Sequence, residues 1–395
     1  MRTWRPPEAS GSALVARAAE VALLAGRGAA EADQERRLPP AVVDAVAGAG
    51  FARQFVATRW GGQEGTFLEA CAAVSLLAEQ CPSTAWTASL AATLGRIAGF
   101  LPEAGQRALW AGGPDTLVAG SLLPLGEAIE VDGGWMVSGR WPYVSTIEQA
   151  RWVLLPAVDR SPAGAGVAWF FALPRGGYAV EQTWNNLGLR ATGSHTVVLE
   201  PTFVSGGYAF RRSALDEGDP VCSAAATHRL PLEAVAGLAF APVVVGAAYG
   251  ALRAWLRANA PRMAAAAAGG RVPVPRPTYD QVLTRSAAEL DAAALLVERV
   301  ARMTDAGGLS PLDVAVSARD CALASELARA VTERLVRATG TSGLAEDQPL
   351  ERFWRDAHAG ASHVMLQLAR SAQGYAALAL AGQEAGRDQG PGGAA

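Results

Sequence analysis

The sequence predicts a mostly helical α+β protein in three consecutive parts: an N-terminal helical domain, a central antiparallel β domain and a C-terminal four-helix bundle. Apolar residues recur at spacings of three and four up to about Trp110 and again after about Leu230, which is typical of helices that bury one face. Between them lie short β-branched and aromatic runs separated by glycine turns. The predicted boundaries are 1–115, 116–225 and 226–385, followed by a disordered, glycine-rich tail at 386–395.

In the N-terminal part, the helix period is clear from Ser12 onward, and another helix is expected at Glu69–Leu77. Pro82, followed by a serine and a threonine, is a helix-start signal, and a long apolar helix is expected from there toward Phe100. Pro102 is expected to begin the next helix.

The central part should hold at least seven short strands, and the Asp132–Gly134 segment is a hairpin signal between two of them. Because no helical pattern separates these strands, they are expected to pair antiparallel in a sandwich or barrel. The expected strands are Leu117–Leu123, Ala128–Val131, Trp135–Ser138, Trp152–Val158, Val167–Leu173, Tyr178–Gln182 and Thr196–Leu199.

The helical period then returns, with a loop expected at Gly269–Pro277. The segment Ala234–Leu252 carries no charge over nineteen residues, which is about the length of a membrane span. Its proline and its many small residues favour a helix buried in the bundle instead. The expected bundle helices are Leu230–Leu256, Tyr279–Thr304, Pro311–Thr339 and Leu350–Ala381.

Composition excludes several classes of function. The chain has no lysine, its 34 basic residues are scattered arginines, and its net charge is −3, so neither nucleic-acid nor polybasic membrane binding is indicated. The four cysteines and four histidines show no metal-ligand spacing, so no metal site is expected. The first residues lack the apolar segment of a signal peptide. A cytoplasmic protein with free thiols is therefore expected.

Three segments carry a family resemblance: VDGGWMVSGRWPYVS at 131–145, WNNLGLRATGSH at 184–195, and ATGTSG at 338–343 followed by PLERFWRDAHAGASH at 349–363. Their order and spacing resemble the acyl-CoA dehydrogenase superfamily over nearly the whole chain. More closely, they resemble its oxygenase branch, the group D flavin-dependent monooxygenases of two-component systems. The resemblance implies the acyl-CoA dehydrogenase-like fold, which is the same helix–sheet–helix order that the residue patterns predict.

The resemblance implies a flavin at the edge of the β domain. Trp141 would stack on the flavin ring, and Ser145 would hydrogen-bond near its N5 atom and act in catalysis. Ser121 matches the position where the family's backbone meets the flavin pyrimidine. The residues alone also allow Trp141 to be an ordinary core residue of the sheet, with Ser145 as a turn serine beside it.

The loop Thr339–Gly343 lies between two expected helices, and its glycines let backbone N–H groups approach a phosphate. In the family this loop serves the flavin of a neighbouring subunit, which assigns Thr341 and Gly343 to cofactor binding. On spacing alone, the residues favour a plain glycine helix stop. Because the loop has fewer glycines than the dehydrogenases carry there, the choice between FAD and FMN stays open.

The last segment bears on the type of reaction. Acyl-CoA dehydrogenases usually carry a catalytic glutamate just after its Arg-Asp pair, whereas this chain has His363 there and no carboxylate. The oxygenase branch has a histidine at this place, so the resemblance assigns His363 as the base that removes a phenol or amine proton. The small residues Ala359–Ala361 are expected to leave room beside its ring. The residues alone also allow a hydrogen-bonded core histidine.

Helical spacing adds two expectations. Arg352 and Asp356 lie four residues apart and should form an ion pair on one helix face. His358 and His363 lie five apart, roughly 140° around a helix, so only one of them should face the flavin. Which of the two does so stays open.

Four residues are assigned to substrate binding. Trp86 lies on the helix whose family counterpart lines the substrate cavity, although a core tryptophan is an equal alternative. Ser194 and His195 lie on a loop that the family places near substrate or flavin, and His358 is the fourth candidate. The fourth histidine of the chain, His228, is expected to be structural.

These observations predict the oxygenase component of a two-component flavin-dependent monooxygenase. A C4a-hydroperoxyflavin, formed from reduced FAD or FMN and O2, would transfer oxygen to an aromatic or amine small molecule, in secondary metabolism or catabolism. No nicotinamide-binding motif is visible, which fits flavin delivery by a separate NAD(P)H:flavin reductase. The resemblance also implies a homo-oligomer, most simply a tetramer. The alternatives are a flavin dehydrogenase or desaturase, and a non-catalytic binding protein on the same fold.

Overall fold

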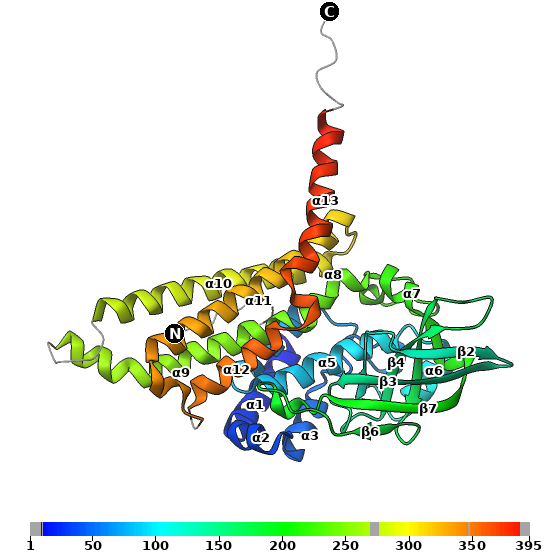
Figure 1. Ribbon diagram of the computed structural model, residues 1–395, viewed down its shortest axis with the longest axis horizontal. Coiled ribbons are helices and arrows are strands. Elements are labelled where there is room, and N and C mark those ends of the chain that lie inside the picture. Colours follow the sequence, from blue (N-terminus) through cyan, green and yellow to red (C-terminus); the bar gives the residue numbers. More distant parts are fainter. Residues whose placement is uncertain (1–8, 10, 269–275, 347, 388–395) are drawn as a thin grey trace, which may run out of the picture.

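The computed structural model describes residues 9, 11–268, 276–346 and 348–387, and places helices on one side of the molecule and a sheet on the other (Figure 1). The expected loop at Gly269–Pro277 therefore falls mostly outside the described residues. So does the expected disordered tail, except that 386 and 387 end the last helix. The N-terminal helices are α1 (Ala13–Arg27), α2 (Ala29–Glu35), α3 (Pro40–Ala49), α4 (Phe67–Ala78), α5 (Pro82–Ala98) and α6 (Glu103–Leu109).

Helix α5 lies between the sheet and the C-terminal helices (Figure 1), and 15 of its 17 residues are buried. It begins at Pro82, as the sequence predicts, because proline needs no hydrogen bond for its nitrogen in a first turn. Its C-terminal half shares an apolar cluster with sheet residues such as Phe170, while Trp86 belongs to the core of the helical domains. Helix α5 therefore joins the two halves of the molecule.

The seven expected strands are present, together with a short eighth strand, β8 (Ala209–Arg211), that was not expected. The strands are β1 (Val118–Gly120), β2 (Gly126–Val131), β3 (Gly134–Val144), β4 (Trp152–Asp159), β5 (Ala168–Pro174), β6 (Ala179–Glu181), β7 (His195–Ser205) and β8 (Ala209–Arg211). Their order is β6-β7-β3-β2-β4-β5-β8, with β1 beside β4.

The sheet is mixed, which corrects the expectation of purely antiparallel pairing. Strands β2 and β3 form the expected hairpin, but β1 and β2 both run parallel to β4. The physical reason is the connection after β3. It reverses the chain direction a second time and places β4 on the far side of β2, so that the two strands run the same way.

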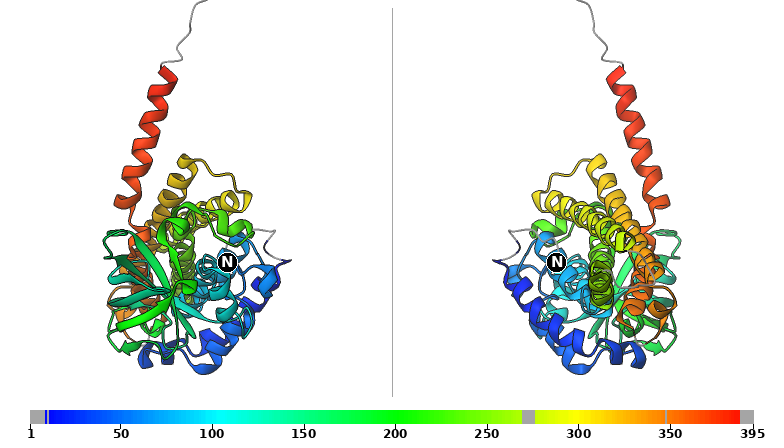
Figure 2. Two further views of the ribbon diagram at one scale, coloured as in Figure 1. Left: turned by 90° about the vertical axis from the view of Figure 1, so that its right-hand side faces the viewer. Right: turned by 90° about the vertical axis from the view of Figure 1, so that its left-hand side faces the viewer.

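The C-terminal region begins with α8 (Leu232–Ala236) and a 3-10 turn, η6 (Gly237–Ala239). Its remaining elements are α9 (Ala241–Ala267), α10 (Arg276–Ala306), α11 (Pro311–Thr339), η7 (Thr341–Leu344), α12 (Pro349–Ala361), η8 (Val364–Leu366) and α13 (Leu368–Arg387). The single helix expected over Leu350–Ala381 is therefore wrong: it is broken after Ala361, and α13 projects away from the body of the molecule (Figures 1 and 2).

Among the described residues, one helical stretch, Leu232–Ala265, is long and apolar enough to cross a membrane. Its most apolar window is entirely buried inside the fold, as expected for a core helix of the bundle. The four cysteines are free thiols, and Cys71, Cys81 and Cys321 are buried.

The absence of a side chain at Gly246 allows α9 to cross very close to α4. A Cβ atom at this position would lie 2.4 Å from the Ser75 carbonyl oxygen and 2.6 Å from the Ala78 Cβ. We therefore expect Gly246→Ala to lower the free energy of unfolding by about 1–3 kcal/mol, the usual cost of overpacking. The matched control is Gly48→Ala in α3, where a Cβ would meet nothing within 4 Å.

Urea unfolding followed by circular dichroism measures both variants. The Gly48→Ala control should be neutral or gain up to ~1 kcal/mol, because alanine favours helix over glycine. Equal stability of the two variants would show that the crossing tolerates a side chain.

Candidate active site

Ser145 directly follows the last residue of β3 and lies between two strained backbone positions. The register of the two strands shifts between Trp141 and Val144, and both Tyr143 (φ 62°) and Thr146 (φ 63°) adopt the left-handed conformation. Each costs of order 1–3 kcal/mol in a residue other than glycine, and such strain persists only where the surrounding structure enforces it. The enforced turn directs the Ser145 hydroxyl into a buried polar cluster.

This cluster is a line of hydrogen bonds that we call the hydroxyl chain: Trp86, Ser145, Ser194, Thr192 and the carbonyl of Leu189. The Trp86 indole N–H donates to Ser145 Oγ over 3.2 Å, and Ser145 Oγ lies 2.7 Å from Ser194 Oγ. Ser194 Oγ lies 2.7 Å from Thr192 Oγ1, which donates to the Leu189 oxygen over 2.9 Å. The three hydroxyl side chains are buried.

Leu189 anchors the far end of the hydroxyl chain. It also adopts a left-handed conformation (φ 51°), and its backbone N–H donates to Asp356 Oδ1 of α12 over 2.6 Å. Its carbonyl oxygen accepts a second side-chain hydrogen bond, from the Trp184 indole N–H over 3.0 Å. The neighbouring Gly188 lies directly on α12, where a Cβ would sit 2.2 Å from the Arg355 carbonyl oxygen.

The ion pair expected between Arg352 and Asp356 is absent among the described residues. Arg355 instead pairs with Glu351, four residues earlier, and with Asp33 of α2 over 2.7 Å. Asp356 instead accepts the backbone N–H of Leu189 through its Oδ1 atom. The expected pair is therefore wrong: the i,i+4 pair that forms lies one residue earlier, on a helix face turned by about 100° from the expected one.

His363 lies beyond the end of α12, so the helical-wheel argument does not apply to it. Its ring stacks on Phe240 at a centroid distance of 3.7 Å and meets the edge of Trp86 at 5.8 Å. Trp86 and Phe240 are themselves 5.0 Å apart, and we call these three rings the ring cluster. The space beside Gly360 is occupied by Trp86, Val244 and Leu189, not left open as expected.

Burial, reinforced by Arg370, lowers the pKa of His363 to about 4, so the imidazole is neutral near pH 7. Its Nδ1 atom accepts the backbone N–H of Met365 over 3.3 Å. The neutral ring therefore carries its proton on Nε2 and presents a donor there. The base role that the resemblance implies would require the other tautomer.

The other two histidine candidates face elsewhere. His358 donates from Nδ1 to the Trp354 carbonyl over 2.8 Å, and its Nε2 lies 3.9 Å from Glu333 of α11. His195 Nδ1 accepts backbone N–H groups of the loop before it, at Thr183 over 3.2 Å and at the next residue. Burial lowers the pKa of both rings. Only His363 shares the ring cluster with Trp86.

Trp141 is completely buried in the core of the sheet, and its indole N–H donates to the Pro156 oxygen over 2.8 Å. Its ring fills the space where Cβ atoms of Gly126 and Gly139 would lie. Trp141 therefore has no face free to stack on a flavin, and its expected stacking role is not supported.

The other expected flavin contacts are not joined to Ser145 in this chain. The Ser121 backbone N–H pairs with Leu154 of β4, and its hydroxyl accepts the Leu123 N–H over 3.2 Å. Thr341 and Gly343 form the 3-10 turn between α11 and α12, at the end of the bundle away from the sheet (Figure 1).

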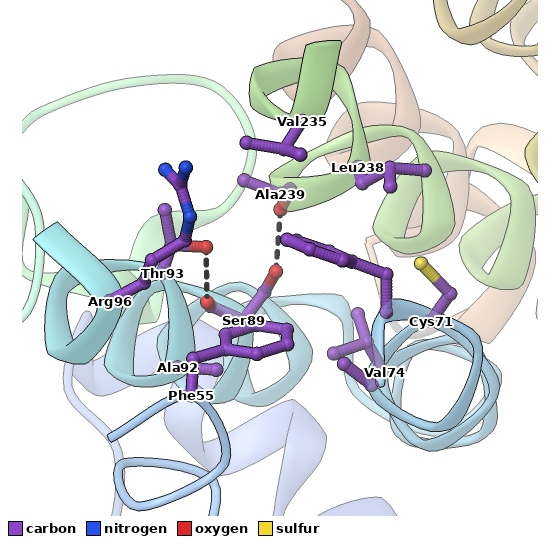
Figure 3. Close-up of a pocket in the computed structure, with 12 residues that line it drawn as sticks. Phe55, Cys71, Val74, Ser89, Ala92, Thr93, Arg96, Val235, Leu238 and Ala239 are labelled. Atoms are coloured by element: carbon purple, nitrogen blue, oxygen red, sulfur yellow. Dashed lines mark hydrogen bonds between the residues drawn. The ribbon is translucent and has the colours of Figure 1, made fainter. Parts of the chain in front are cut away.

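A separate interior pocket lies between α4, α5 and η6 (Figure 3). Its lining includes Ser89, one turn after Trp86, whose hydroxyl donates to the Ala239 oxygen over 2.6 Å. Arg96 also borders it, but its guanidinium points to the backbone oxygens of Thr227 and Leu230. Burial lowers the pKa of Arg96 to about 9.

Four residues indicated by the sequence, Trp86, Ser145, Ser194 and His363, lie together in the structure. Thr192, Leu189 and Phe240 also belong to this site and were not predicted. A hydroxyl two residues before Ser194 was the available signal for Thr192. Nothing in the sequence distinguishes Phe240 as a site residue, because an aromatic residue within an apolar helical segment is usually a core residue.

The fold and these sites define the class of protein. Residues 14–109 match the family model for the acyl-CoA dehydrogenase N-terminal domain, and residues 238–368 match the model for its C-terminal domain. The chain therefore belongs to the acyl-CoA dehydrogenase superfamily, as the motifs indicate.

More particular relatives are oxygenases. The chain is 31% identical to the oxygenase component of the FADH2-dependent resorcinol hydroxylase of Rhizobium sp. (strain MTP-10005), covering 89% of this chain and 90% of that protein. It is 30% identical to the flavin-dependent monooxygenase oxygenase subunit HsaA of Mycobacterium tuberculosis, covering 83% and 85%. This protein is thus the oxygenase component of a flavin-dependent monooxygenase.

Comparison with solved structures supports the same assignment. The crystal structure of HsaA from M. tuberculosis superposes with a TM-score of 0.87 at 26% identity, covering 93% of this chain and 97% of that chain. XiaF from Streptomyces sp., in complex with FADH2 and glycerol, superposes with a TM-score of 0.82 at 29% identity, covering 92% and 93%.

Asp356 gives a prediction about pH. Burial raises its pKa to about 7, above the value near 4 of an aspartate in an unfolded chain. Protonated Asp356 therefore favours the folded state, and this contribution is lost as the pH rises from about 4 to about 7. Asp356→Asn keeps the oxygen that accepts the Leu189 N–H and cannot titrate.

We expect the unfolding free energy of the wild type, measured relative to Asp356→Asn, to fall by roughly 2 kcal/mol between pH 5 and pH 7. Urea titrations of both proteins at four pH values between 5 and 8 measure this difference. Parallel pH profiles would show that Asp356 is already ionised at pH 5.

Proposed function

We propose that this oxygenase component binds reduced FAD or FMN, supplied by a separate NAD(P)H:flavin reductase, and uses O2 to oxygenate an aromatic or amine small molecule. The observation that carries this proposal is the meeting of the Ser145 hydroxyl, the Trp86 indole and the His363 imidazole in one buried place. The sequence relatives and the FADH2 complex of XiaF support it.

The residues around Ser145 fit a flavin in two respects. Ser145 Oγ keeps a free lone pair beyond its contacts with Trp86 and Ser194, and it lies at the end of a strained turn. Beside it, Tyr143 is 66% exposed and meets Trp184 edge-on, which offers an uncovered aromatic surface. When bound, reduced flavin would supply two electrons to O2, so that one oxygen atom of O2 is transferred to the substrate and the other leaves as water.

The chain's own residues would hold the flavin, exclude water and orient the substrate. Ser145 holds the flavin N5 position, and the apolar rings of Trp86 and Phe240 exclude water and pack against an aromatic substrate. His363, neutral and with its proton on Nε2, donates a hydrogen bond that orients a substrate oxygen or nitrogen. Ser121 meets the flavin pyrimidine, and Thr341 and Gly343 serve the flavin of a neighbouring subunit.

The test of His363 separates a donor from a base. His363→Phe keeps the stack on Phe240 and removes both ring nitrogens, so product per reduced flavin should fall at least about tenfold while hydrogen peroxide release rises. His363→Asn keeps an N–H donor and should retain most of the product. His358→Asn, on the α11 side, is the matched control and should behave as the wild type.

Protein loaded anaerobically with reduced flavin is mixed with O2 and a panel of phenols and amines, and product, peroxide and flavin absorbance are followed. A transient absorbance distinct from reduced and oxidised flavin is expected. Full product from His363→Phe would remove His363 from the reaction, and loss of product in His363→Asn would restore the base role.

We also propose a homo-oligomer, most simply a tetramer, assembled through the C-terminal helices. Helix α13 projects from the body (Figure 2), and Leu378 (37% exposed) and Leu380 (66% exposed) lie on it. The two leucines lie on different sides of the helix, about 200° apart, and exposed leucines on a projecting helix are typical of a segment that other subunits cover.

Leu380→Glu should lower the mass measured by light scattering, because a charge would be buried in the interface. Leu23→Glu, at a residue 65% exposed on α1, is the control and should keep the wild-type mass. An unchanged mass in Leu380→Glu would place the interface elsewhere.

A further inference from the structure

The hydroxyl chain has ends of fixed hydrogen-bonding type. At one end the Trp86 indole nitrogen has a hydrogen and no lone pair to accept with, so it only donates. At the other end the Leu189 carbonyl oxygen has no hydrogen, so it only accepts. The three hydroxyls between them each have one hydrogen to give.

These ends determine the direction of every bond between them. Thr192 gives its only hydroxyl hydrogen to the Leu189 oxygen, so at 2.7 Å from Ser194 it must accept. Ser194 therefore gives its hydrogen to Thr192 and accepts from Ser145. Ser145 in turn gives its hydrogen to Ser194 and accepts from Trp86. All the hydrogens point from Trp86 toward Leu189.

The acceptor end of the hydroxyl chain is held firmly. The Leu189 oxygen also accepts from the Trp184 indole and from the Thr192 backbone N–H, over 3.0 and 3.2 Å. The Leu189 N–H is bound by Asp356, so the peptide groups on both sides of this residue are fixed. Turning the Ser145 hydrogen toward a ligand would leave Ser194 without its donor, and hydrogen bonds in such a line strengthen one another.

Ser145 is consequently left with a lone pair and no hydrogen to offer. We infer that Thr192 and Ser194 are positioning residues that hold the Ser145 hydroxyl as an acceptor, so that the site favours reduced flavin, whose N5 carries a hydrogen, over oxidised flavin, whose N5 does not. This inference rests on the proposed function, which places the flavin N5 at Ser145. Oxidised flavin would bring one acceptor against another.

The direction of the hydroxyl chain would explain why reduced flavin binds to this protein and oxidised flavin leaves it. Reduced flavin arriving from a reductase finds an acceptor for its N5 hydrogen. Oxidised flavin, formed at the end of the cycle, meets an unpaired lone pair and binds less tightly. The preference comes from the direction of the hydroxyl chain, and not from a charge at Ser145.

Thr192→Val tests the inference, because valine matches threonine in shape and cannot accept from Ser194. The hydrogens of Ser194 and Ser145 are then free to turn, and Ser145 becomes able to donate to N5. The matched control is Thr196→Val: Thr196 is 2% exposed against 1% for Thr192, and its hydroxyl pairs with Thr183 over 2.7 Å, outside the hydroxyl chain.

Anaerobic calorimetry gives the dissociation constants of reduced and oxidised FAD and FMN for each protein. The wild type and Thr196→Val should bind the reduced form at least about tenfold more tightly. In Thr192→Val this ratio should fall about tenfold, chiefly through tighter binding of oxidised flavin. Thr192→Ser, which restores a hydroxyl, should recover the wild-type ratio.

Ser194→Ala frees the Ser145 hydrogen by another route and should lower the ratio in the same way, which keeps the test decisive if Thr192→Val folds poorly. An unchanged ratio in both variants would overturn the inference while leaving the proposed function intact. Failure of the wild type to bind either flavin would instead overturn the proposed function.

Discussion

The backbone of Leu189 is the point on which the rest of the site depends. Its N–H is bound by Asp356 of α12, and its carbonyl oxygen accepts from two side chains and one backbone group. These bonds tie the segment before β7 to a helix 167 residues further along the chain. The same carbonyl ends the hydroxyl chain, so the position of α12 and the orientation of the Ser145 hydroxyl are coupled.

The position of α12 is in turn enforced by buried charge. Arg355 bridges Glu351 of its own helix, Asp33 of α2 and the Leu187 carbonyl, so the guanidinium has a partner on three sides. A buried cation that lost these partners would carry a large desolvation cost, which favours one arrangement of the three segments over others. The same network holds the Leu187 carbonyl, two residues before Leu189, which keeps its left-handed conformation.

The break between α12 and α13 shows why local pattern alone misplaced His363. Apolar spacing continues through the break, so the sequence reads as one helix. In the fold, the Gln367 side chain donates to the carbonyl oxygens of Ala361 and His363, which replaces hydrogen bonds that a continuing helix would make. Stacking on Phe240 holds the His363 ring where a helix would have turned it away.

The sequence by itself determined the order of helices and strands, the motifs of the family and four residues of the site, because periodicity and residue type record whether a segment is buried and what chemistry it carries. The tertiary structure alone decided which way side chains face. Trp141 keeps the alternation of Trp135 and Val137 along β3, but only the packed sheet shows that its ring is completely enclosed and has no face left for a ligand. The partners of Asp356 and Thr192 were likewise decided by packing, since contacts between distant segments leave no local period in the chain.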